Sequence, residues 1–340
     1  MKVCIYGAGA IGGWIGVRLA KAGHDVSVVA RGATLDAIGE NGLQLIEAGE
    51  THTVQVSASD HPSDIGVQDL VVIAVKAPAM ASVADGIAPL VGPGTRILTA
   101  MNGVPWWFCA GLGGTFATHR LASVDPDGAI TAALPASQVI GCVVHASCLL
   151  AAPGVVQHHQ GNRLIVGNAS AQPASSGAGP GSGSGASDDA ATDVQALLAE
   201  AGFAAERSDF IQRDVWYKLW GNMTMNPISA ITGATTDRIL NDDLVRAFVT
   251  SVMLEAKEIG ARMGIPIDQQ PSDRHATTLK LGAMETSMLQ DVKARRAVEL
   301  DALVGAVREL GAMSGVPTPF TDALMGLARL QARTLGLYPA

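Results

Sequence analysis

Residues 2–12 read KVCIYGAGAIG, a short apolar run followed by a glycine-rich turn. The run Lys2 to Tyr6 is rich in β-branched and aromatic side chains, which favour a strand. A helix is expected to follow the turn, and Gly23 ends it before the next strand. A strand, a G-x-G-x-x-G turn and a helix in this order are what a dinucleotide-binding βαβ unit requires. The stretch therefore predicts a nucleotide-binding fold.

The glycines of this turn have separate expected tasks. Gly7 allows a tight turn, Gly9 lets the backbone approach a pyrophosphate, and Gly12 allows close helix packing. The amino end of the helix would hold negative charge. A glycine-rich turn that binds nothing is the alternative, which the strand and helix around it disfavour. The predicted cofactor-binding residues of the turn are Gly7, Ala8, Gly9, Ala10, Ile11 and Gly12.

Further β-branched runs alternate with helical stretches in the first half of the chain, the pattern of a parallel sheet flanked by helices. The other expected strands are 25–30, 70–75, 96–100, 139–147, 154–158 and 163–166. Beyond residue 208 the strand signals stop and periodic helices continue. The predicted fold class is α/β, with an N-terminal Rossmann-type doubly wound sheet (1–207) and an all-helical C-terminal domain (208–340). A crevice between two such cores would bind small ligands.

Between residues 168 and 193 the composition changes to Ala, Gly, Ser, Pro and Asp. Such a stretch cannot bury enough apolar surface to offset the entropy of ordering it. We predict a flexible surface insertion between a strand and the helix 194–201.

The composition excludes several classes of protein. A net charge of −8 without a basic cluster argues against nucleic-acid binding. No signal peptide is evident, and Lys76 and Asp85 interrupt the most apolar stretch, so no membrane span is expected. The four cysteines lack CxxC spacing, and His158-His159 lacks partners at metal-ligand spacing. We expect a cytoplasmic protein without a metal.

Three polar residues follow predicted strands. After the second strand comes Ala30-Arg31-Gly32, where NAD enzymes place a carboxylate for the ribose 2′-hydroxyl. Because a guanidinium there suits a 2′-phosphate, Arg31 predicts NADP; a solvated surface cation is the alternative. Lys76 and Asn102 follow the next two strands, at the sheet edge where ligands bind. For these two, an exposed cation and an Asn-Gly turn are the alternatives.

Lys218, Asn222 and Asn226 recur at intervals of four on a predicted helix that opens near residue 208. Positions four apart drift by only ~40° around a helix, so the three share one side with Ile211. Burying such groups without partners costs about 2 kcal/mol or more each, which indicates a lined cavity. Alternatively, Lys218 reaches the surface and the asparagines cap or kink the helix. Pro227 is expected to bend it.

A second helix is predicted from Ser287, where residues 287–290 fit a capping box. A helix amino end also attracts carboxylates, so capping and substrate binding can coincide. Along the same helix Glu299 lies on the edge of the apolar stripe, four residues before Leu303. Lys218 and Glu299 would form a proton-handling pair, in which the ammonium stabilises charge on a keto oxygen and delivers the proton.

The ordered segments Gly7–Gly12, Asn102-Gly103, residues 216–227 and residues 287–299 resemble the ketopantoate reductase family over nearly the whole chain. The resemblance implies a Rossmann domain plus a helical domain, NADPH as cofactor, and reduction of 2-dehydropantoate to pantoate on the route to coenzyme A.

The resemblance also implies roles for the polar residues of the second domain. Lys218 would be the general acid and Glu299 its carboxylate partner near the substrate hydroxyl. Asn222 and Asn226 would hold the substrate, and Ser287 its carboxylate.

The resemblance implies that Asn102 contacts the cofactor and the reaction centre. Arg31 and Lys76 would contact the adenosine phosphate region or orient the cofactor. The chain departs from the family pattern at Thr236 and Met284, where some members carry substrate-binding asparagines. A different 2-oxo acid therefore stays open, as does a non-catalytic NADPH sensor. A homodimer through the helical domain stays open too.

Overall fold

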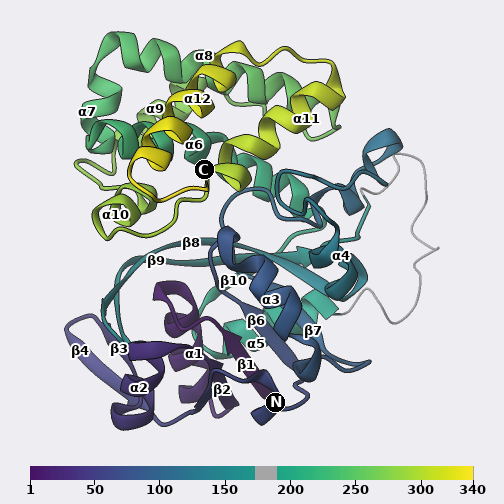
Figure 1. The fold of residues 1–340 in the computed structure, drawn as a ribbon, viewed down its shortest axis with the longest axis vertical. Helices are drawn as coiled ribbons and strands as arrows, with labels where there is room; N and C mark the ends of the chain where they lie inside the picture. The colour runs from purple at the N-terminus through teal and green to yellow at the C-terminus, as the bar shows by residue number, and fades with distance from the viewer. Residues whose placement is uncertain (173–189, 340) are drawn as a thin grey trace. The chain divides into compact units, whose positions relative to one another are not determined.

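The structure is a computed structural model that describes residues 1–172 and 190–339. The chain divides into two compact units (Figure 1). Unit 1 comprises residues 1–101 and 128–211, and unit 2 comprises residues 102–127 and 212–340. Each unit is described by itself below.

Unit 1 is built on a ten-stranded sheet, counted over its described residues, in the order β4-β3-β9-β8-β7-β6-β1-β2-β5 with β10 beside β9. The strands are β1 (Lys2–Tyr6), β2 (Asp25–Val29), β3 (Leu43–Glu47), β4 (Glu50–Val54), β5 (Ser57–Ser59), β6 (Leu70–Ile73), β7 (Arg96–Thr99), β8 (Val139–Ala152), β9 (Val155–Asn168) and β10 (Ala204–Arg207). Strands β2, β1, β6 and β7 pair in parallel, which confirms the predicted Rossmann-type sheet.

The remaining strands differ in detail from the prediction. Strands β8 and β9 form one long antiparallel hairpin around Gly154 (φ +72°), whereas three short strands were expected there. Strand β9 is continuous across the predicted break because Gly161 (φ +79°) lies at an irregularity of the β8–β9 pairing, which lets the strand adjust its register without ending. The pair β3–β4 was not predicted, since its short alternation carries a weak signal.

The helices of unit 1 are α1 (Ala10–Lys21), α2 (Gly32–Asn41), α3 (Met80–Gly86), α4 (Ala129–Ala133) and α5 (Ala190–Glu200). Trp14, Ile15 and Leu19 of α1 are fully buried in one apolar cluster with the sheet. At the ends of the predicted insertion, residue 168 closes β9 and residues 190–193 open α5, so these flanks are ordered elements. The Asp193 carboxylate pairs with Arg96 at 2.7 Å. Residues 173–189 lie outside the described part of the chain.

Unit 2 is helical, and Figure 1 shows its helices in green to yellow. They are α6 (Ile211–Thr232), α7 (Thr236–Asn241), α8 (Asp243–Arg262), α9 (Pro271–Leu279), α10 (Ser287–Lys293), α11 (Ala306–Ser314) and α12 (Pro319–Thr334), with a π-helical turn at Asp301–Gly305. Trp216 and Trp220 of α6 are buried, and their indole N–H groups donate to backbone carbonyls of α8. None of the helices in the described residues is both long and apolar enough for a membrane crossing.

Residues 102–127 belong to unit 2, whereas the prediction placed them in the first domain. The reason is a set of long-range contacts with the helical part of the chain. Glu309 of α11 accepts hydrogen bonds from the backbone N–H groups of Ala122 and Ser123, each at 2.8 Å. The Nε2 atom of His119 lies 2.9 Å from the same carboxylate. A single boundary at 207/208 therefore does not describe the division.

Candidate functional site

A cavity of about 250 Å³ lies in unit 1 beside the glycine-rich turn. Its lining includes Gly7, Ala8 and Gly9 from the turn between β1 and α1, and Arg31 and Thr34 from the turn after β2 and the start of α2. The structure thus brings the glycine turn and Arg31 to one cavity.

The three glycines differ in what surrounds them. Gly7 has φ +99°, and a Cβ on it would lie 2.6 Å from a Val75 methyl group. A Cβ on Gly12 would lie 2.0 Å from the Gly7 carbonyl oxygen, so only glycine fits at this helix–turn contact. A Cβ on Gly9 would meet no described atom within 4 Å. The space beside Gly9 can therefore take a ligand against the bare backbone.

Gly9 is also the N-cap residue of α1, and among the described residues no side chain caps this helix and its first turn holds no acidic residue. Ala10 and Ile11 form the start of the helix. The first amide groups of a helix have no intrahelical acceptor and carry partial positive charge, so this end suits an anion such as a pyrophosphate.

Arg31 is held in place by two side chains that the sequence did not point to. Its Nη2 donates to Ser82 Oγ at 2.7 Å. The second side chain is Tyr6, which also lines the cavity and is hydrogen-bonded to Arg31. Burial raises the pKa of Tyr6, and the charge and hydrogen bond of Arg31 partly oppose that rise. Lys76 precedes the short 3₁₀ turn 77–79 and is half-buried, but it is not among the residues that line the cavity.

In unit 2, Lys218 and Asn102 lie together. The Nζ atom of Lys218 donates to Asn102 Oδ1 at 2.8 Å, which makes an internal polar pair. The loop that carries Asn102 packs on the π-helical turn, since the Val104 N–H donates to the Ala302 carbonyl at 2.8 Å. Gly103 has φ +79°, and a Cβ on it would lie 2.6 Å from that carbonyl oxygen. The Asn-Gly pair is therefore a turn as well as the source of the amide.

Asn226 and Ser287 also meet. Asn226 is 5% exposed, and its Nδ2 donates to Ser287 Oγ at 3.3 Å. The predicted capping role of Ser287 is wrong: Thr286 is the N-cap of α10, and its hydroxyl accepts from the Leu289 N–H at 3.3 Å. Because Thr286 caps the helix, the Ser287 hydroxyl serves Asn226 instead. Helix α6 continues past Pro227 to residue 232.

Glu299 is buried at 6% exposure, but it does not lie on the helix of Ser287 as predicted. That helix ends at Lys293, Arg295 adopts φ +56°, and residues 296–299 are not helical. Glu299 stands just before the π-helical turn and three residues before Ala302, on which the Asn102 loop packs. Such turns are frequent at functional sites. Asn222 is half-buried on α6, one turn after Lys218.

The two positions that depart from the family pattern lie in contact. The Thr236 N–H donates to the Met284 carbonyl at 3.0 Å, and the Thr236 hydroxyl donates to the Gly282 carbonyl at 2.9 Å. Thr236 is 1% exposed. Both departures therefore lie at one place in the fold, and Met284 is three residues before Ser287 along the chain.

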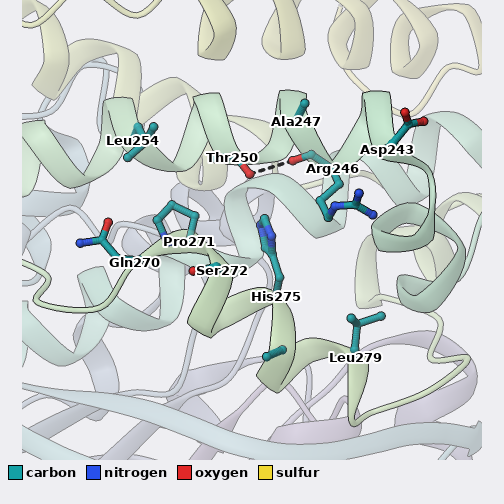
Figure 2. A pocket seen from close by; sticks show the side chains of 11 residues that line it. Asp243, Arg246, Ala247, Thr250, Leu254, Gln270, Pro271, Ser272, His275 and Leu279 are labelled. Atoms are coloured by element: carbon teal, nitrogen blue, oxygen red, sulfur yellow. Dashed lines mark hydrogen bonds between the residues drawn. The ribbon is translucent and has the colours of Figure 1, made fainter.

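A second cavity, about 740 Å³ in volume, lies between α8 and α9 (Figure 2). Figure 2 shows Arg246 and Thr250 on α8 and His275 on α9, and the Thr250 hydroxyl donates to the Arg246 carbonyl. Burial lowers the pKa of His275, and the charge of Arg246 adds to that effect. None of the predicted site residues lines this cavity. Across the described residues, no group of three or more metal-ligating side chains occurs.

Comparisons with known proteins agree over the whole chain. The family model Ketopantoate reductase PanE/ApbA matches residues 3–171, and Ketopantoate reductase PanE/ApbA C terminal matches residues 210–332. A curated 2-dehydropantoate 2-reductase from Mesorhizobium japonicum is 42% identical, over 99% of this chain and 100% of the relative.

Solved structures agree as well. One from Ralstonia solanacearum MolK2, with a provisional ketopantoate reductase assignment, has a TM-score of 0.91 and 52% identity over 99% of both chains. A D-mandelate dehydrogenase structure with NADH and anilino(oxo)acetate has a TM-score of 0.82 at 23% identity, over 99% of this chain and 100% of that one. This last likeness concerns the fold alone.

Proposed function

We propose that this chain, which belongs to the ketopantoate reductase family, catalyses the NADPH-dependent reduction of 2-dehydropantoate to pantoate on the route to coenzyme A. The observation that carries the proposal is the Lys218–Asn102 hydrogen bond, which holds an ammonium group in a polar part of the helical unit. An ammonium in a fixed position is what proton delivery to a keto oxygen needs.

The family implies a nicotinamide cofactor, and we propose NADP. The residues of the cavity in unit 1 fit this choice, because Gly9 leaves the backbone bare and the amino end of α1 suits a pyrophosphate. Arg31, anchored on Ser82, would bind the 2′-phosphate with its guanidinium. When bound, the reduced nicotinamide supplies the hydride that the keto carbon accepts.

Within unit 2, Lys218 would act as the general acid. As negative charge builds on the keto oxygen, its ammonium stabilises that charge and transfers a proton from Nζ. The Asn102 amide oxygen orients the ammonium at 2.8 Å. The buried Glu299 carboxylate would accept a hydrogen bond from the substrate hydroxyl.

The substrate would be oriented by three further side chains of the same unit. The amides of Asn222 and Asn226 would hold it along α6, and the Ser287 hydroxyl would donate to its carboxylate. The Asn226–Ser287 hydrogen bond supports a shared task, since it keeps both groups in one place before substrate arrives.

A second candidate keeps this chemistry and changes the substrate to another small 2-oxo acid. The observation in its favour is the contact between Thr236 and Met284, which puts both departures from the family pattern at one spot. Two lost amides at one spot would alter which substrate side chain fits.

The test is NADPH oxidation, followed by absorbance, with 2-dehydropantoate beside a panel of other 2-oxo acids. We expect the highest kcat/KM for 2-dehydropantoate, and Lys218→Ala serves as the control that the rate belongs to this enzyme. A higher kcat/KM for another acid would favour the second candidate. No turnover with any acid would mean that the chain binds NADPH without catalysis.

We also propose a cytoplasmic enzyme that forms a homodimer through its helical unit. Burial raises the pKa of the Cys4, Cys109 and Cys148 thiols to about 12, which suits unreactive packing groups in a reducing compartment. Seven of the nine large hydrophobic side chains that are exposed among the described residues lie in unit 2. Light scattering of the purified protein tests the dimer.

A further inference from the structure

The segment after α12 runs beside the stretch that carries Glu299. The Val298 N–H donates to the Leu337 carbonyl at 3.2 Å, and the Tyr338 hydroxyl donates to Asp301 Oδ1 at 2.5 Å. Leu337 is itself buried at 6% exposure. Val298 before Glu299 and Asp301 after it are therefore hydrogen-bonded to two consecutive residues, Leu337 and Tyr338.

These ties matter because Glu299 precedes, rather than belongs to, a regular helix. Its backbone carbonyl accepts from the Leu303 N–H at 3.2 Å, which links it to the π-helical turn that follows. A buried carboxylate is costly unless its position lets it meet the right partner. The position of the Glu299 side chain thus depends on how firmly the turn at Asp301–Gly305 is held.

The same turn also supports the loop of Asn102. Gly103 and Val104 pack against Ala302, and Asn102 accepts the hydrogen bond of Lys218. Contacts therefore run without interruption from Tyr338, through the π-helical turn, to the ammonium group.

We propose that Tyr338 is a positioning residue for Glu299: by anchoring Asp301, its hydroxyl holds the π-helical turn so that the Glu299 carboxylate keeps its place relative to Lys218. Tyr338 itself is a structural donor and transfers no proton to substrate. Burial and the hydrogen bond to Asp301 raise the pKa of Tyr338 to about 12, so it keeps its proton at neutral pH. This inference rests on the proposed function for the meaning of Glu299.

The first variant to test is Tyr338→Phe, which removes only the hydroxyl. We expect kcat to fall by a factor of about ten, the worth of one hydrogen bond to a charged group, with unchanged Kd for NADPH. The matched control is Thr321→Val in the same unit. It removes the 2.6 Å hydrogen bond that the Thr321 hydroxyl donates to the Glu255 carboxylate. The control should lower thermal stability and leave kcat unchanged. An equal fall in kcat for both variants would reduce the role of Tyr338 to general stability and overturn the proposal.

A double variant separates positioning from an independent effect. In a Glu299→Gln background, Tyr338→Phe should cause little further loss of kcat, because the group that it positions is already gone. Two losses that multiply would show that Tyr338 acts apart from Glu299.

Amide hydrogen exchange provides a readout that needs no substrate. In Tyr338→Phe the amides of residues 298–304 should exchange about tenfold faster, while those of α8 stay protected as in the parent chain. Unchanged exchange at 298–304 would overturn the proposal, whatever the activity. If the parent chain does not reduce 2-dehydropantoate, the proposed function fails, and the exchange result still decides whether Tyr338 orders the Glu299 segment.

Discussion

Lys218 and Asn102 are 116 positions apart in the chain and 2.8 Å apart in the fold. A half-buried ammonium needs such a partner, because leaving it unbonded would cost more free energy than the pair itself contributes. The same holds for Asn226 with Ser287. Lys218 and Asn226 of α6 are thus each bonded to a residue of another segment, and we propose that these two pairs engage the substrate.

The first prediction concerns Lys218. Lys218→Ala should lower kcat by a factor of ~10² or more, because the ammonium acts mainly in the transition state. The affinity for NADPH should change little. Steady-state kinetics together with a binding titration check both expectations. Turnover equal to that of the parent chain would remove this lysine from the mechanism.

The second prediction concerns the reading of the 2′-phosphate by Arg31. Arg31→Ala should lower the NADPH/NADH ratio of kcat/KM by about 10- to 100-fold. The reason is that a charge-assisted hydrogen bond to the 2′-phosphate contributes about 1.5–3 kcal/mol of binding free energy. Ser82→Ala leaves the charge and removes only the anchor at 2.7 Å, so it should lower the ratio less. An unaltered ratio in Arg31→Ala would assign the phosphate to another residue.

At the scale of elements, the start of α10 separates two tasks on neighbouring residues. Thr286 caps the helix, and Ser287 bonds to Asn226 on α6. A cap satisfies backbone N–H groups that would otherwise lack acceptors, whereas the second hydroxyl is left for the site.

The third prediction follows from this separation. Thr286→Ala should lower the free energy of unfolding by about 1 kcal/mol and leave the KM of the 2-oxo acid unchanged. Ser287→Ala should do the reverse, raising KM with a change in unfolding free energy below about 0.5 kcal/mol. Chemical denaturation and steady-state kinetics on both variants decide it. If Ser287→Ala proved the more destabilising, the cap would have been assigned to the wrong residue.

Two other elements show where local patterns stop being informative. A proline inside a helix costs about 3 kcal/mol, yet α6 runs through Pro227, which is buried among packed helices that offset the loss. Conversely, residues 294–299 keep an apolar spacing that suits a helix, but Arg295 turns left-handed and the helix ends.

At the scale of the whole molecule, the buried histidine of unit 2 makes stability depend on pH. Burial and the nearby Arg246 lower the pKa of His275 in the folded state, so the unfolded chain binds the proton more readily. Stability therefore rises with pH up to about 6.5, the ordinary histidine value, and is lost as pH falls below it.

The fourth prediction follows from this direction of the pH dependence. Between pH 5 and 7 the free energy of unfolding should increase with pH, by at most about 1.4 kcal/mol per pH unit for one proton. His275→Gln should flatten that slope. Glu309 does not interfere: burial alone would raise its pKa, but bonds from Ser123, His119 and Ala122 bring it below the usual value, so it stays charged in this range. Denaturation at several pH values checks this, and an equal slope in His275→Gln would contradict it.

The amino-acid sequence alone was enough to predict the βαβ start, the parallel strands, the helical second half and the family. The first three depend on local signals: glycine spacing, alternation of period two, or a helical period of 3.6. The family follows from a resemblance in the order of the motifs along the chain. The residues Lys218, Asn226 and Asn102 could also be named in advance, because polar side chains at apolar helix positions or strand ends are unusual.

Which of these residues meet could be seen only in the folded chain. The tertiary structure placed residues 102–127 with the helices, gave the cap of α10 to Thr286, put Glu299 before a π-helical turn and set Arg31 against Ser82. The cap of α10 is a local contact, since the Thr286 hydroxyl accepts from the Leu289 N–H three residues on. The other three outcomes depend on partners far away in the chain, whose hydrogen bonds and packing outweigh local preferences of about 1 kcal/mol or less per residue.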